Sequence, residues 1–372
     1  MGPRKGRSVP RTKAGPPKRA AAKPAASVEQ LLARTQELMD DNKYDAALKT
    51  AIRAVELDER NAQALLLAAI IQLESGDVEP AINCLLRCVE ISPDRGFEKY
   101  MYLGQFTVEL ESVRYFQLGI DALQRDLDEV AGDSDRAAVL RRKMAEAYVA
   151  MTEVYLTDCC FDGDAEKRCE EYLERGAQAD PGCPEVFQTM ASVRLSQSRP
   201  DDARECLAKG MALWLDRDQS DASSIPSYES RLALVRLLLE LDDKEQALGL
   251  LERLQKEDDE NVDLWYLYGW TYHLQCEREH PSDEEKTQLL VSARECFKQA
   301  VRLAGIQEFE NDALIEHARE MVAAIDAAVP PTADDDECCA GGPDGDQADD
   351  APGREWEDAS SDGDGGDVEM GA

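Results

Sequence analysis

A spacing of 34 residues between similar segments is the feature that most limits how this 372-residue chain can fold. Residues 44–48 and 54–57 carry small and aliphatic side chains, and the same types return in register in residues 78–82 and 88–91. Between residues 28 and 328 the apolar positions follow a helical period, with no alternating strand pattern. A fixed period of roughly 20–50 residues is typical of supersecondary units stacked in a row. The sequence therefore predicts an all-α solenoid.

The repeated unit resembles the tetratricopeptide repeat (TPR), whose period is also 34 residues. Counted from Val28, the first helix of a unit has a small residue at place eight, and the second has small residues at places twenty and twenty-seven. Small residues let two helices cross closely, and large neighbours fill the space beside them. We expect a TPR superhelix of about seven helical hairpins over residues 28–328, with a capping helix at about 308–328 and units starting near residues 28, 62, 97, 145, 184, 228 and 262.

Charge divides the chain into three parts. Residues 1–26 hold eight Lys or Arg and no acid, whereas residues 330–372 hold fifteen Asp or Glu and one Arg. Since the whole chain carries −35 and the two ends carry +8 and −14, the part between them carries −29. We expect both ends to be disordered tails flanking the TPR domain. An acidic domain repels nucleic acid and anionic membranes and attracts basic proteins.

No motif indicates secretion, cysteine chemistry or catalysis. The basic start of the chain is not followed by an apolar stretch, so we expect a soluble intracellular protein with its eleven cysteines reduced. Cys84 and Cys88 share a helix face and could form a metal pair, but Cys88 occupies a small-residue place, which favours packing. The common nucleotide-binding, zinc-protease and hydrolase motifs are missing, so we expect neither enzyme activity nor a cofactor.

Acidic residues recur at place two of the predicted units. Compensation of the helix dipole explains acids there, at roughly 0.3–1 kcal/mol each. It does not explain acids farther along the first helices, at places nine and thirteen. A groove that binds a basic segment explains both sets. The place-two residues are Glu29, Gln63, Glu98, Glu146, Glu185, Glu229 and Asp263, and the later acids are Asp40, Glu74, Glu109, Glu153 and Glu240.

Aromatic residues concentrate in the seventh unit. Trp265, Tyr268 and Tyr272 stand at places that predict core packing. Tyr266 and Trp270 stand at places five and nine, which line the inner groove of a TPR superhelix. For these two, contact with a partner and packing on the next unit remain equal alternatives. The predicted client-binding set is Glu74, Glu98, Glu109, Glu146, Glu153, Glu185, Glu229, Asp263, Tyr266 and Trp270.

The basic segment from Lys13 to Lys23 admits two interpretations. It is either a solvated tail or a nuclear localisation signal bound by an import receptor. It has no interleaved aromatic residues, so we do not expect direct contact with nucleic acid. The residues predicted for import are Lys13, Lys18, Arg19 and Lys23.

The whole layout resembles the fungal dedicated assembly chaperones of ribosomal protein L4. The resemblance rests on seven degenerate TPR units, a basic N-terminal tail, an acidic C-terminal tail and an acidic groove. It implies that the chain binds the long basic internal loop of the newly made ribosomal protein. It also implies that the chain keeps this client soluble and escorts it from cytoplasm to nucleus.

Two other functions fit a TPR domain of this kind. One is a scaffold in a multiprotein complex, for which an apolar or mixed groove is more usual. The other is an acidic histone-type chaperone, which the Asp-rich tail would suit equally well. A pull-down analysed by mass spectrometry would separate these functions.

Overall fold

The computed structural model describes residues 26–130, 133–217, 225–277, 282–307 and 309–330. Nearly all of both predicted tails, including the four import residues, lies outside this part of the chain. The described residues form fifteen α-helices and no strand, which confirms the predicted all-α class. In that part of the chain, no helix combines the length and the apolar character that crossing a bilayer requires.

The helices follow one another as hairpins along the chain. They are α1 Val28–Asp40, α2 Tyr44–Leu57, α3 Ala62–Glu74, α4 Val78–Ile91, α5 Glu98–Gln105, α6 Glu109–Glu129, α7 Ser134–Leu156, α8 Ala165–Ala179, α9 Pro184–Ser196, α10 Pro200–Ala212, α11 Tyr228–Glu240, α12 Lys244–Glu257, α13 Val262–Cys276, α14 Asp283–Ile306 and α15 Asp312–Ala328.

Small residues sit where the pattern places them, between the two helices of a unit. The alanines at place twenty of units one, two, five and six are all fully buried: Ala47, Ala81, Ala203 and Ala247. In unit seven, a Cβ on Gly269 would come within 2.9 Å of the Phe297 ring. Close crossing of the two helices therefore requires the missing side chain.

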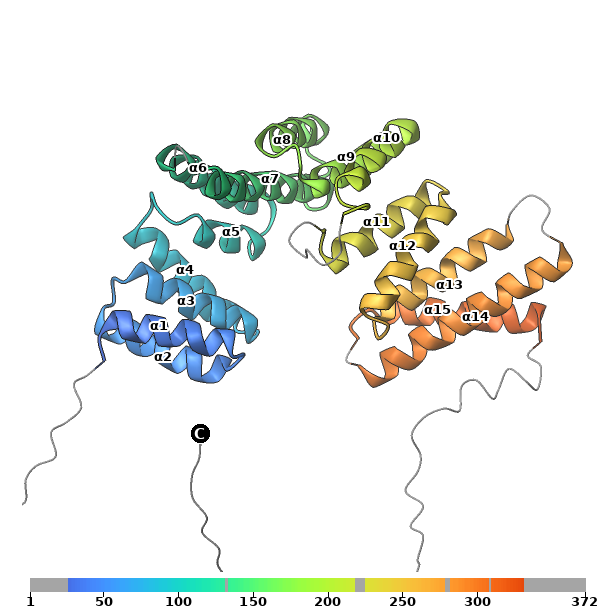
Figure 1. Cartoon of the computed structure of the whole chain (residues 1–372), viewed down its shortest axis with the longest axis horizontal. Helices are drawn as coiled ribbons and strands as arrows, with labels where there is room; N and C mark the ends of the chain where they lie inside the picture. The colour runs from blue at the N-terminus through green and yellow to red at the C-terminus, as the bar shows by residue number, and fades with distance from the viewer. Residues whose placement is uncertain (1–25, 131–132, 218–224, 278–281, 308, 331–372) are drawn as a thin grey trace, which may run out of the picture.

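First helices of several neighbouring units pack directly on one another. Helix α1 packs on α3, α7 on α9, and α11 on both α9 and α13. Among the described helices, no two second helices of neighbouring units pack extensively on each other. The stack bends into the arch of Figure 1, where α7 and α9 lie inside the crown and α8 and α10 outside.

Four units end their first helix with the same backbone turn. At place fifteen, Asn42, Gly76, Ser198 and Asp242 all have positive φ, between 56° and 79°. The next residue's N–H then bonds to the carbonyl five residues back, as in Lys43 to Leu38 (2.8 Å) and Arg199 to Arg194 (2.8 Å). This is the Schellman arrangement, which satisfies the last carbonyls of a helix.

Units three and four depart from this regular turn. Residues 106–108 join α5 to α6, and residues 157–164 join α7 to α8. The predicted start of unit four near residue 145 is wrong, because α7 already begins at Ser134. Asp133 caps that helix by accepting a hydrogen bond from the Arg136 N–H (3.1 Å). The capping helix also begins later than predicted, since Asn311 caps α15 at the Leu314 N–H (3.1 Å).

Candidate functional site: the inner surface

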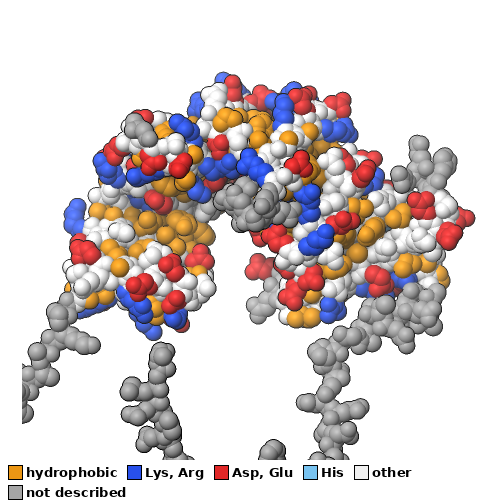
Figure 2. All heavy atoms as spheres, viewed as in Figure 1, with side chains coloured by type: hydrophobic (Ala, Val, Ile, Leu, Met, Phe, Trp, Pro, Cys, Tyr) orange, Lys and Arg blue, Asp and Glu red, His pale blue; other side chains and the backbone are white. Residues whose placement is uncertain are grey.

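We call the surface formed by the first helices α1, α3, α5, α7, α9, α11 and α13 the inner surface; in Figure 1, α7 and α9 lie on the inside of the arch. All seven carry predicted client-binding residues or acids of the same pattern. Figure 2 shows acidic and basic side chains over both limbs and the crown, with hydrophobic side chains exposed on the limb that holds α3, α4 and α5. The visible surface therefore carries both charges. In the whole chain, acidic residues outnumber basic ones.

Tyr102 of α5 marks the point where acids from two helices come together. Burial raises the pKa of its phenol, and the charges of Glu74 on α3 and Glu98 on α5 raise it further. Lys143 on α7 acts in the opposite direction. Glu74 is exposed and Glu98 half-buried, and neither has a basic partner within ion-pair distance in the described part of the chain. Two predicted site residues therefore place their charges beside one aromatic ring, and neither forms an ion pair among the described residues.

Two predicted acids occupy different places from those expected. Glu146 does not open a helix, because it lies in the middle of α7, where it forms an ion pair with Lys143 (2.7 Å). Helix-dipole compensation therefore does not explain it. Glu109 is not at the end of a first helix; it is the first residue of α6, with φ of 54°. The unit pattern misplaced both because units three and four have irregular lengths.

Basic neighbours partly neutralise two further predicted acids. Arg142 of α7 approaches Glu185 at 4.0 Å, and Arg236 of α11 binds Asp263 at 2.6 Å. Glu229, at the start of α11, is exposed and has no such partner among the described residues. The sequence pattern missed the role of Arg142, because it lies ahead of the position where unit four was expected to begin.

Glu153, near the end of α7, has an unusual environment for a surface acid. Its side chain is exposed to solvent, yet desolvation raises the pKa of its carboxyl. The two facts fit a concave position, where water reaches the carboxylate from one side and protein displaces it on the others. A charge with reduced hydration acts more strongly on a nearby cation.

Tyr266 and Trp270 of α13 are both half-buried and contact the capping helix. The Tyr266 hydroxyl lies 3.0 Å from Nδ1 of His317 on α15, and its ring meets the Phe297 ring edge-on at 5.8 Å. Trp270 stacks on His273 and meets His317 edge-on. Packing on the next element is therefore present, and contact with a partner stays a prediction for the faces that remain exposed.

The nine cysteines among the described residues are free thiols, and all but Cys160 are buried or half-buried. Cys88 is buried and donates to the Ala62 carbonyl (3.3 Å), and burial raises its pKa to about 11. No group of three or more His, Cys, Asp or Glu in the described ranges could hold a metal ion. These contacts account for Cys88 through packing.

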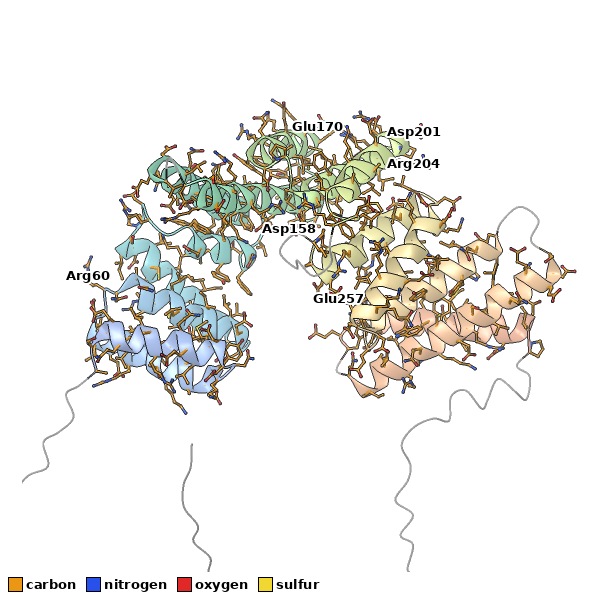
Figure 3. The ribbon with its side chains drawn as sticks, viewed as in Figure 1. Arg60, Asp158, Glu170, Asp201, Arg204 and Glu257 are labelled. Carbon is orange, nitrogen blue, oxygen red and sulfur yellow. The ribbon has the colours of Figure 1, made fainter. Side chains whose placement is uncertain are left out.

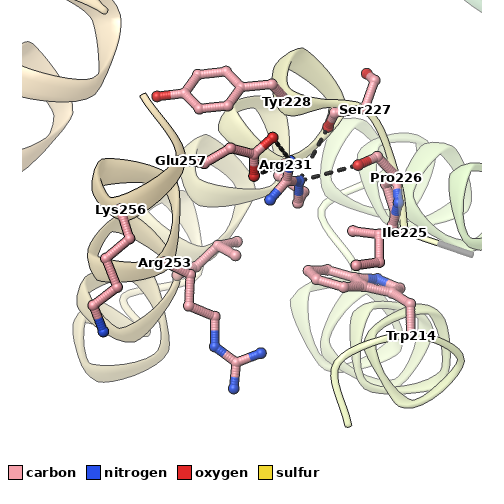
Figure 4. A pocket seen from close by; sticks show the side chains of 10 residues that line it. Trp214, Ile225, Pro226, Ser227, Tyr228, Arg231, Arg253, Lys256 and Glu257 are labelled. Carbon is pink, nitrogen blue, oxygen red and sulfur yellow. Dashed lines mark hydrogen bonds and ion pairs between the residues drawn. The ribbon is translucent and has the colours of Figure 1, made fainter. Parts of the chain in front are cut away.

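The pocket in Figure 4 lies between the turn that follows α10, the start of α11, and α12, and internal contacts occupy its arginines. Arg231 binds Glu257 (2.7 Å) and donates to the Pro226 carbonyl (3.0 Å), while Arg253 donates to the Leu215 carbonyl (2.9 Å). These contacts of the two arginines hold units five and six together, so we assign the pocket a structural role.

Comparison with known proteins first identifies the class of repeat protein to which this fold belongs. Residues 32–95 and 232–279 match the tetratricopeptide repeat family. A solved tetratricopeptide repeat protein from Parabacteroides merdae, 12% identical, superposes over 80% of this chain and 98% of that one with a TM-score of 0.50. Fold and matches together define a TPR superhelix.

More similar proteins then give the family. The probable assembly chaperone of rpl4 from Emericella nidulans is 33% identical, over 82% of this chain and 83% of that protein. Its namesake from Schizosaccharomyces pombe is 29% identical, over 82% and 93%. A solved structure titled assembly chaperone of RpL4 (Acl4), residues 1–338, is 34% identical, covering 68% of this chain and 98% of that one with a TM-score of 0.63. This chain belongs to the family of assembly chaperones of rpl4.

Proposed function

We propose that this chain is a non-enzymatic chaperone that binds newly made ribosomal protein L4 on its inner surface. The client's long basic internal loop is the segment held there. The chaperone keeps it soluble in the cytoplasm and accompanies it to the nucleus for ribosome assembly. The names of the relatives support the client, and the acids on the first helices support the place where it binds.

The observation that carries the proposal is that Glu74, Glu98 and Glu153 lie on successive first helices and that none of them has a basic partner within ion-pair distance among the described residues. These residues come from α3, α5 and α7, so one extended basic segment could run past all three. A basic loop left free would bind RNA non-specifically through its charge. Acids on a concave surface reinforce one another's field and compete for such a loop.

Reversing these three acids should abolish most of the binding. Each exposed pair contributes only about 0–1 kcal/mol, but the set acts together. We therefore expect the variant with Glu74→Lys, Glu98→Lys and Glu153→Lys to lose affinity for the basic loop of L4 by about a hundredfold or more. Isothermal titration calorimetry measures this, and circular dichroism checks that the helices remain.

A matched control makes the same change in net charge on the second helices. It carries Glu90→Lys, Glu174→Lys and Glu252→Lys, three exposed acids on α4, α8 and α12. This control should bind nearly normally, and wild-type affinity should fall as salt rises above about 0.15 M. Equal losses in the two variants, or binding that ignores salt, would rule out the inner surface as the site.

A further inference from the structure

The two irregular turns of the solenoid touch each other. The Glu109 N–H, at the start of α6, donates to the Asp158 carboxylate in the α7–α8 turn (3.1 Å). Val108, the N-cap residue of α6, offers no side-chain acceptor of its own, so Asp158 caps this helix from another unit. Figure 3 labels Asp158 beneath the crown of the arch. Residues 106–110 and 157–164 therefore meet at one edge of the solenoid.

Large apolar side chains gather on this edge without a partner. Phe106 is 39% exposed, Val108 68%, Leu110 56% and Phe161 98%. They make up four of the ten large hydrophobic residues that are exposed in the described part of the chain. We call these four residues the apolar rim. Exposed apolar residues scattered singly need no explanation, but a group at the meeting point of two turns indicates a contact surface.

Acids surround the rim on both turns. Glu109, Glu111, Asp158 and Asp162 are exposed, and none has a basic partner within ion-pair distance among the described residues. Asp164 is paired, to Arg168 at 2.9 Å. The rim is also continuous with the inner surface, because Glu153 lies one turn before the α7–α8 connection and its carbonyl accepts from the Thr157 hydroxyl (2.9 Å).

We propose that the apolar rim is a second contact for the same client, where apolar side chains flanked by Lys or Arg dock. The proposal rests on the proposed function and adds a binding mode that charge alone does not supply. The acids select a basic flank, and Val108 and Phe161 supply apolar area. A second copy of this chain fits poorly, since its rim would bring the same four unpaired acids into contact with these.

The salt dependence of binding distinguishes the contribution of the apolar rim from that of the inner surface. Apolar contacts do not weaken with ionic strength, whereas exposed charge pairs do. We expect Val108→Ser with Phe161→Ser to weaken binding of full-length L4 by about tenfold, at both about 0.15 M and about 0.5 M salt. The deficit of the Glu74, Glu98 and Glu153 reversal should instead shrink as salt rises. The rim substitutions should also make the heat-capacity change of binding less negative.

The control substitutes exposed apolar residues elsewhere, Ile52→Ser in α2 and Ile306→Ser in α14, 43% and 72% exposed. It should bind L4 normally. Normal binding by the rim variant at both salt concentrations would overturn the rim while leaving the inner surface intact. A chain that does not bind L4 at all would overturn both. A dimer of the unaltered chain that the rim substitutions dissociate, seen by sedimentation, would make the rim a self-association surface instead.

Discussion

At the scale of single residues, the charge of Glu153 is unfavourable for the stability of the fold but favourable for the proposed binding of a basic client. Desolvation raises the pKa of its carboxyl, so the folded state holds the proton to higher pH than the unfolded state does. The contribution of this group to stability is therefore full at low pH and is lost as the pH rises through the folded-state pKa. At neutral pH the carboxylate destabilises the fold. We infer that the role of this charged residue is to bind the client.

Glu153→Gln tests this conflict directly. At pH 7 the amide removes the desolvated charge, so Tm should rise slightly, while affinity for the basic loop of L4 should fall. At about pH 3.5, below the ordinary glutamate pKa of 4.5, both proteins are neutral at this position and their Tm values should coincide. Thermal unfolding followed by circular dichroism at the two pH values gives the answer. A lower Tm at pH 7 would show that the carboxylate stabilises the fold.

At the scale of elements, the turn at place fifteen repeats a backbone shape for which glycine is best suited. Only unit two uses Gly there; Ser198 adopts φ of 58° in unit five. A left-handed conformation costs a residue with a Cβ about 1–2 kcal/mol. We expect Ser198→Gly to raise the free energy of unfolding by about 0.5–1 kcal/mol, since glycine's greater unfolded-state entropy offsets part of the gain.

The reciprocal change, Gly76→Ala, is the matched partner. A Cβ there would meet no atom within 4 Å, so only the φ of 79° opposes it. It should therefore lower the free energy of unfolding by about 1 kcal/mol. Urea denaturation measures both changes. Equal stability of Ser198→Gly and wild type would mean that Ser198 is not strained.

Regular elements were predictable from the sequence, and irregular ones were not. Val28, Pro184 and Tyr228 begin helices as the 34-residue pattern predicts, because those units keep the standard hairpin length. The pattern misplaced Glu109 and Glu146, since α6 and α7 are longer than a standard repeat helix. The repeat pattern could not predict the cap that Asp158 forms or the ion pairs of Arg142. These contacts join residues from different units, and their distance in space depends on the irregular turns.

At the scale of the whole molecule, the basic N-terminal segment lies outside the described residues, and its role stays a prediction. If it carries a nuclear localisation signal, replacing Lys13, Lys18, Arg19 and Lys23 with Ala should shift a fluorescent fusion toward the cytoplasm. The control replaces Arg4, Lys5 and Arg7, which lie outside that segment, and should leave the distribution unchanged. An unchanged distribution of the first variant would mean that import depends on the client or another signal.

Extensive contacts of the described helices are confined to helices that are near neighbours along the chain. This affects both how the protein folds and how local unfolding spreads. Among the described helices, none packs extensively on a helix more than two positions away along the chain. Such a chain has low contact order, so its hairpins can form early and propagate without waiting for distant segments to meet. Damage to one unit is likewise transmitted only through its neighbours. The function proposed above benefits from both properties, since the chain can fold quickly and one frayed end leaves the middle of its inner surface formed.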